Sequence, residues 1–122
     1  MLSRMKPIKP RVHGIIDYVA CGTMLAAPSL LGLNGAARTA SYAFAGTYLV
    51  ISALTDYPPA LKRTIPFPLH GKIELSSVPA LAALPFLVGS LKGGKERAYF
   101  LGLAGTVLGA YTLTDWEADP DA

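Results

Sequence analysis

The chain has 122 residues, of which 52% are hydrophobic and only 16% are charged, so its composition is more apolar than that of a typical water-soluble domain. Its length allows one domain, residues 1–122. A formal net charge of +3 would suit a nucleic-acid partner. The basic residues, however, gather at the ends of apolar runs, where membrane proteins carry them. We therefore expect a lipid bilayer as the partner and no nucleic acid.

Four long stretches of the chain contain no charged residue. They lie between Asp17 and Arg38, between Arg38 and Asp56, between Glu74 and Lys92, and between Arg97 and Asp115. Each is close to the ~20 residues that a helix needs to cross the ~30 Å hydrocarbon layer. Ala, Leu and Gly dominate them, whereas strands favour alternating β-branched residues. The sequence predicts helices at about 11–33, 36–57, 68–90 and 97–116. The alternative is a soluble helical bundle with an unusually apolar surface.

An internal repeat organises these stretches. Residues 45–57 align without gaps on residues 104–116, with seven of thirteen positions identical. The segments before them also match, His13-Gly14 with His70-Gly71 and Asp17 with Glu74. The chain is therefore expected to be two tandem helical hairpins, repeat 1 at about 11–57 and repeat 2 at about 68–116. Because each hairpin crosses the membrane twice, the repeats would be parallel and related by a pseudo-two-fold axis along the membrane normal. The predicted fold is therefore an all-α, integral membrane four-helix bundle.

Basic residues predict which way the bundle faces. Seven lie on the side of the N-terminus: Arg4, Lys6, Lys9, Arg11, Lys62, Arg63 and Lys72. Four lie on the opposite side: Arg38, Lys92, Lys95 and Arg97. The positive-inside rule then places both termini in the cytoplasm, with a bacterial inner membrane as the expected location. Gly105 and Gly109 have the spacing of a GxxxG motif, which predicts close packing within the bundle or a homodimer face.

Each repeat has a histidine followed four residues later by an acid, and further along a proline followed four residues later by a glycine, Pro28 with Gly32 and Pro85 with Gly89. In these features the chain resembles the SPW-repeat family of small bacterial membrane proteins. Units of that family open a helix with a His-x-x-x-Asp pair and close an apolar stretch with Ser-Pro-Trp and a Gly. The matching segments here run from His13 to Asp17 with residues 27–32, and from His70 to Glu74 with residues 84–89. Ser29 and Phe86 stand where the motif has Trp. The resemblance implies a membrane location and four helices, and it implies no defined activity.

The repeat duplicates a set of ionisable residues. Such residues are costly in a membrane span, roughly 2.5–3.5 kcal/mol near the bilayer centre, and usually serve a function there. His13 and Asp17 are four residues apart and share a helix face, as do His70 and Glu74. Asp56 and Asp115 end the second and fourth predicted helices. Because odd helices begin where even helices end, all six residues should lie at one membrane face.

Two histidines and four carboxylates are also the ligands of di-iron and di-manganese carboxylate bundles. We therefore predict a metal ion or di-metal centre of Fe, Mn or Zn held by six residues: His13, Asp17, Asp56, His70, Glu74 and Asp115. The order differs from those bundles, since His here precedes the carboxylate and the spacing is four.

Two other functions fit the same residues. They could form a small transporter or a path for protons or ions. They could instead belong to a non-catalytic accessory or scaffold protein, in which Arg11, Lys62, Arg63 and Lys72 neutralise the acids and the cluster only holds helix ends together. The sequence contains no P-loop, dinucleotide fingerprint or nucleophile elbow, so whether there is catalysis is left open.

Overall fold

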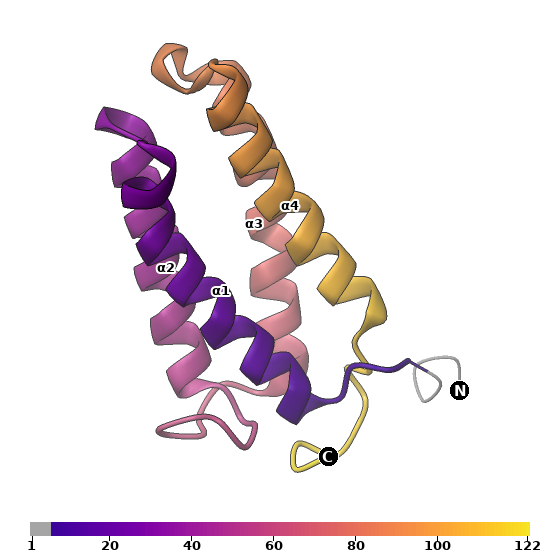
Figure 1. Ribbon diagram of the computed structural model, residues 1–122. Coiled ribbons are helices and arrows are strands. Elements are labelled where there is room, and N and C mark those ends of the chain that lie inside the picture. Colours follow the sequence, from indigo (N-terminus) through magenta and orange to yellow (C-terminus); the bar gives the residue numbers. More distant parts are fainter. Residues whose placement is uncertain (1–5) are drawn as a thin grey trace.

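A computed structural model describes residues 6–122, and Arg4 lies outside the described residues. This part of the chain folds into the helices α1 (Pro10–Leu31), α2 (Gly35–Leu54), α3 (Phe67–Leu87) and α4 (Gly94–Leu113), with a short 3-10 turn, η2 (Gly89–Leu91) (Figure 1). Helix α1 packs along α2, and α3 packs along α4. The prediction of an all-α, four-helix architecture built from two helical hairpins is confirmed.

Helix ends follow local chemistry. Pro10 and Pro68 lie in the first turns of α1 and α3, where the missing N–H of proline breaks no helical hydrogen bond. Gly32 ends α1 with a φ of 66°, a conformation that favours glycine. Helices α2 and α4 each end three residues before the predicted position. Thr55 and Thr114 adopt extended conformations there and cap the two helices.

Two parallel bridges draw the polar helix ends together. Ile8, before α1, pairs with Thr114 after α4, and Ile65, before α3, pairs with Thr55 after α2. The backbone N–H of Asp115 donates to Ile8 (2.9 Å) and that of Asp56 to Ile65 (2.7 Å). Figure 1 shows the segment that leads into α1, the C-terminal segment after α4 and the α2–α3 connection at one end of the bundle, opposite the two hairpin turns. The predicted placement of the repeated polar segments at one end follows from these bridges.

All four helices expose large hydrophobic side chains on the outside of the bundle. Val19 on α1 is 63% exposed, Val50 on α2 is 59% exposed, and Leu87 on α3 is 79% exposed. Among the described residues, α1 alone is both long and apolar enough to cross a membrane, judged by length and composition. Helices α2, α3 and α4 have 20 or 21 residues and differ from α1 in composition rather than in length. The four-span topology stays a prediction.

The GxxxG pair does not pack inside the bundle. A Cβ atom added at Gly105 or Gly109 would meet no described atom within 4 Å, nor would one at Gly102. These glycines therefore leave an open strip on α4, and the homodimer stays a prediction.

Candidate metal centre

Four of the six predicted ligands converge between α1 and α3. His13 and Asp17 lie one turn apart on α1, and His70 and Glu74 lie one turn apart on α3. All four side chains are buried, the most exposed being Asp17 at 7%. One ligand atom from each lies within 4.8 Å of the others. This group could hold a metal ion.

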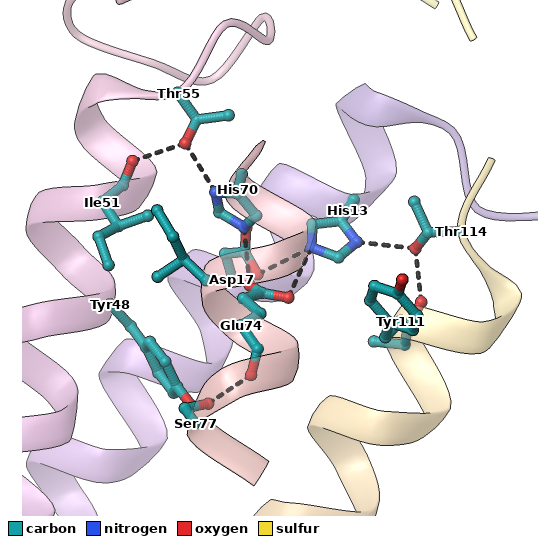
Figure 2. A network of polar contacts seen from close by, with 12 residues as sticks. His13, Asp17, Tyr48, Ile51, Thr55, His70, Glu74, Ser77, Tyr111 and Thr114 are labelled. Carbon is teal, nitrogen blue, oxygen red and sulfur yellow. Dashed lines mark hydrogen bonds and ion pairs between the residues drawn. The ribbon is translucent and has the colours of Figure 1, made fainter. Parts of the chain in front are cut away.

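The four side chains form a ring in which nitrogen and carboxylate alternate (Figure 2). Nε2 of His13 lies 3.3 Å from Oδ1 of Asp17 and 3.1 Å from Oε2 of Glu74. Nε2 of His70 lies 3.1 Å from Oδ2 of Asp17 and 2.7 Å from Oε1 of Glu74. Each carboxylate thus contacts both imidazoles. We call this set of four residues the His/carboxylate ring.

A threonine at the end of the other hairpin orients each histidine. Oγ1 of Thr55 lies 2.6 Å from Nδ1 of His70, and its hydroxyl donates to the Ile51 carbonyl at 2.7 Å. The last carbonyls of a helix lack backbone partners, and the threonine hydroxyl satisfies one of them. Because that hydroxyl has a single proton, Thr55 must accept the hydrogen bond from Nδ1–H of His70.

The second half of the ring repeats this arrangement. Oγ1 of Thr114 lies 2.8 Å from Nδ1 of His13, and its hydroxyl donates to the Ala110 carbonyl at 2.5 Å. Figure 2 shows one continuous line of contacts from Thr55 through both imidazoles to Thr114. Histidines that bind metals characteristically donate their second ring N–H in this way.

With both Nδ1 atoms protonated, the two Nε2 atoms and the carboxylates enclose a centre that needs positive charge. Either each Nε2 carries a proton, so that two imidazolium ions balance two carboxylates, or one divalent cation replaces those two protons. Both states are electrically neutral, which a buried site requires. One ligand atom from each residue lies within 4.8 Å of the other three, and two imidazoles with two carboxylates are ligands that Zn²⁺ accepts. The ring residues therefore fit a metal ion.

Aromatic residues close the ring on the side of the chain termini. The Phe67 ring meets that of His13 edge-on with centroids 5.6 Å apart, and the Trp116 ring lies 4.9 Å from His13. Tyr57 covers His70 at 5.6 Å. Tyr57 and Phe67 are 0% and 2% exposed, so they separate this side of the ring from solvent.

The glycines that follow the two histidines make room for this aromatic cover. A Cβ atom at Gly71 would lie 2.9 Å from the Trp116 ring, and one at Gly14 would lie 3.1 Å from Tyr57 and 2.7 Å from Pro59. The repeated His-Gly pair thus combines an orienting imidazole with a position where no side chain fits.

Tyr57 also contacts the ring directly. Its hydroxyl donates to Oδ2 of Asp17 at 3.0 Å. Burial and the neighbouring Asp17 carboxylate raise the pKa of the Tyr57 phenol, so it keeps its proton and remains a donor. Trp116, the matching residue of repeat 2, donates its indole N–H to the Tyr111 carbonyl instead (2.9 Å).

Asp56 and Asp115 do not belong to the converging group of four. Oδ1 of Asp56 accepts a hydrogen bond from Arg63 at 2.7 Å in a partly exposed pair. Oδ2 of Asp115 accepts one from Lys9 at 2.9 Å. Arg63 was one of four cations expected to neutralise the acids of the cluster. It pairs with Asp56 and with Asp121, and not with the His/carboxylate ring.

The sequence predicted that each histidine shares a helix with its carboxylate, which the structure confirms, but it did not predict the residues that contact these four side chains. Thr55 and Thr114 were not among the predicted site residues, yet each bonds back to its own helix and also contacts a histidine. The signal was present, because both threonines occupy the same position in the repeat. The contact of Tyr57 with Asp17 had no such signal, since the other repeat has Trp116 there.

Comparison of the chain with protein-family models, with curated proteins and with solved structures gave no match. The resemblance to the SPW-repeat family therefore rests on the residues quoted for it, and the His/carboxylate ring is the feature that points to a function.

Proposed function

We propose that this protein is a small integral membrane protein whose four-helix bundle binds one divalent transition-metal ion in the His/carboxylate ring. The observation that carries the proposal is the pair of hydrogen bonds that His13 and His70 donate to Thr114 and Thr55. They fix the Nδ1–H tautomer of both imidazoles and direct both Nε2 atoms at the shared carboxylates. Two imidazoles and two carboxylates suit Zn, Fe or Mn.

The ligand count favours one ion over a di-metal centre. Di-metal carboxylate bundles use four carboxylates with two histidines. Here Asp56 and Asp115 are paired with Arg63 and Lys9, which leaves two carboxylates for the ring. A second divalent ion would bring two further positive charges into the buried ring with no acid to balance them.

The membrane location is supported by where polar and apolar side chains lie, which is the reverse of their usual places in a water-soluble protein. Ionisable groups are buried in the ring, while large apolar side chains cover the outside of every helix. An apolar surface of this extent marks contact with a membrane or a partner. The uncharged helix centres, the distribution of basic residues and the SPW-repeat resemblance agree with four spans and cytoplasmic termini. If this is correct, the bulk of the protein should stay with the membrane fraction after an alkaline wash, and release into the supernatant would contradict it.

Elemental analysis of gently purified protein in detergent tests the metal site. We expect about one equivalent of a transition metal per chain, and near-complete loss of it in a variant carrying both Asp17→Asn and Glu74→Gln. Glu96→Gln, at the opposite end of the bundle, is the matched control and should keep the metal. Circular dichroism would show that both variants are folded.

The result that would overturn the proposal is less than about a tenth of an equivalent in the wild-type protein, both as purified and after incubation with Zn²⁺, Fe²⁺ or Mn²⁺. The ring would then be a proton-bridged network that only joins the hairpins, as in a scaffold protein. Metal retained in the double variant would also contradict it, because the ion would then lie elsewhere.

A further inference from the structure

A small cavity lies directly beside the ring, inside the bundle. It has a volume of about 20 Å³, and all four helices contribute to its wall. Asp17 and Glu74 line it together with six other residues: Ile16, Ala20, Tyr48, Thr106, Val107 and Ala110. The two carboxylates of the ring therefore face an open space on this side, whereas aromatic rings cover the other side.

The size of the cavity limits what it can hold. A cavity must offer at least ~10–15 Å³ to accept one water molecule, so about 20 Å³ is room for one water or one diatomic molecule. Most of its wall is apolar, and the carboxylates of Asp17 and Glu74 are the charged groups in it. A ligand in this space would thus contact the ring on one side and hydrocarbon on the others.

We propose that the cavity is the open coordination position of the metal site and accepts a water molecule or a diatomic ligand. The inference rests on the proposed metal binding and adds the class of ligand to it. Structural metal sites are closed by their protein ligands, whereas catalytic sites keep a position for water or substrate and can become five-coordinate, as this site would be with one ligand added to the four ring residues. The ring supplies the protein ligands, and the cavity supplies the one free direction.

The same geometry excludes larger ligands from the metal. Tyr57 and Phe67 are buried across the terminal side of the ring, so an organic substrate has no access there. On the other side, Ala20 and Ala110 line the cavity, whose volume is about 20 Å³. Any chemistry at the metal would therefore act on water or on a small diatomic molecule.

Nitric oxide binding to the iron-loaded protein tests the inference. Nitric oxide is diatomic and neutral, so it can cross the apolar wall, and it forms an iron–nitrosyl complex with a distinctive electron paramagnetic resonance signal. Under anaerobic conditions we expect about one nitrosyl per bound iron. Ala20→Leu should fill the cavity and weaken nitric oxide binding at least about tenfold while iron stays bound, a change of ~1.4 kcal/mol.

Two further variants keep this test decisive. Ala26→Leu makes the same substitution on α1 at an exposed position and should behave as wild type. Ala20→Val adds less volume and replaces Ala20→Leu if the larger residue prevents folding. Iron bound without any nitrosyl signal in the wild-type protein would overturn the inference, and so would full nitrosyl formation in folded, iron-loaded Ala20→Leu. Failure to bind any of Fe²⁺, Zn²⁺ and Mn²⁺ would instead contradict the proposed function.

Discussion

The two repeats contribute equally to the His/carboxylate ring but unequally to its cover. Each supplies one histidine and one carboxylate, and each supplies the threonine that orients the histidine of the other repeat. His13 of repeat 1 donates to Thr114, and His70 of repeat 2 donates to Thr55. Neither hairpin can therefore complete its own half of the ring, and the site exists only when both hairpins are folded together.

The aromatic rings are exchanged in the same way, since Tyr57 lies over His70 and Trp116 lies over His13, but their hydrogen bonds differ between the halves. Tyr57 donates to Asp17, whereas the indole N–H of Trp116 reaches the Tyr111 carbonyl and leaves Glu74 without an aromatic donor. The histidines, carboxylates and threonines thus occur in both halves of the ring, whereas the Tyr57 hydrogen bond occurs in one half only.

Removal of either histidine should abolish metal binding. His13→Ala and His70→Ala each delete one nitrogen ligand and leave two buried carboxylates with one imidazole. We expect near-complete loss of metal and a fall of ~3–5 kcal/mol in the free energy of unfolding, as when one partner of a buried ion pair is removed. Elemental analysis and denaturant titration measure the two effects. The variants should match each other closely, and metal retained by only one of them would refute the equal roles of the two histidines.

Loss of an orienting threonine should weaken metal binding without abolishing it. Thr55→Val and Thr114→Val keep the side-chain shape but leave Nδ1–H of His70 or His13 without an acceptor. Removing a hydrogen-bond partner of a metal-binding histidine typically lowers metal affinity ~10–100-fold, and we expect that range for each variant. Competition with a chelator of known affinity measures it. Thr23→Val is the control, because Thr23 bonds only its own helix, at the Val19 carbonyl. Affinities equal to that of the control would rule out the threonines as positioning residues.

The unequal cover predicts unequal responses to two aromatic substitutions. Tyr57→Phe removes the hydroxyl that donates to Asp17 and should cost ~1.5–3 kcal/mol of stability, the usual value for a hydrogen bond to a charged group. Metal affinity should fall less than with either threonine variant, because Asp17 keeps both imidazole contacts. Trp116→Phe should leave metal affinity unchanged, since its N–H bonds the Tyr111 carbonyl. A larger loss of affinity for Trp116→Phe than for Tyr57→Phe would contradict the contrast between the halves.

The architecture could be predicted from the sequence because the uncharged runs set the number of helices and the internal repeat sets how they pair. Four uncharged runs and a duplicated hairpin predict four helices, and the four helices are present. The spacing of four between His13 and Asp17, and between His70 and Glu74, also predicts correctly that each pair shares a helix face.

The limits of prediction lay at the helix ends and in side-chain orientation. Placing Asp56 and Asp115 with the ring assumed that α2 and α4 continue to residues 57 and 116. Both helices instead stop before Thr55 and Thr114, whose extended backbones direct the threonine side chains to the histidines. This three-residue difference at each helix end decides which of two adjacent polar side chains faces the core, and no sequence pattern fixes it.

Asp56 and Asp115 give the smallest expected effect on bound metal, and they separate a four-residue ring from a six-residue centre. Asp56→Asn and Asp115→Asn should each keep one equivalent of metal with unchanged affinity. Their stabilities should differ, because the Asp56–Arg63 pair is partly exposed and worth less than ~1 kcal/mol, whereas the Asp115 side chain is 2% exposed beside Lys9. Denaturant titration would show the difference, with Asp115→Asn the less stable variant. If either substitution lowered the metal content, that aspartate would be a ligand and the site would have to include it.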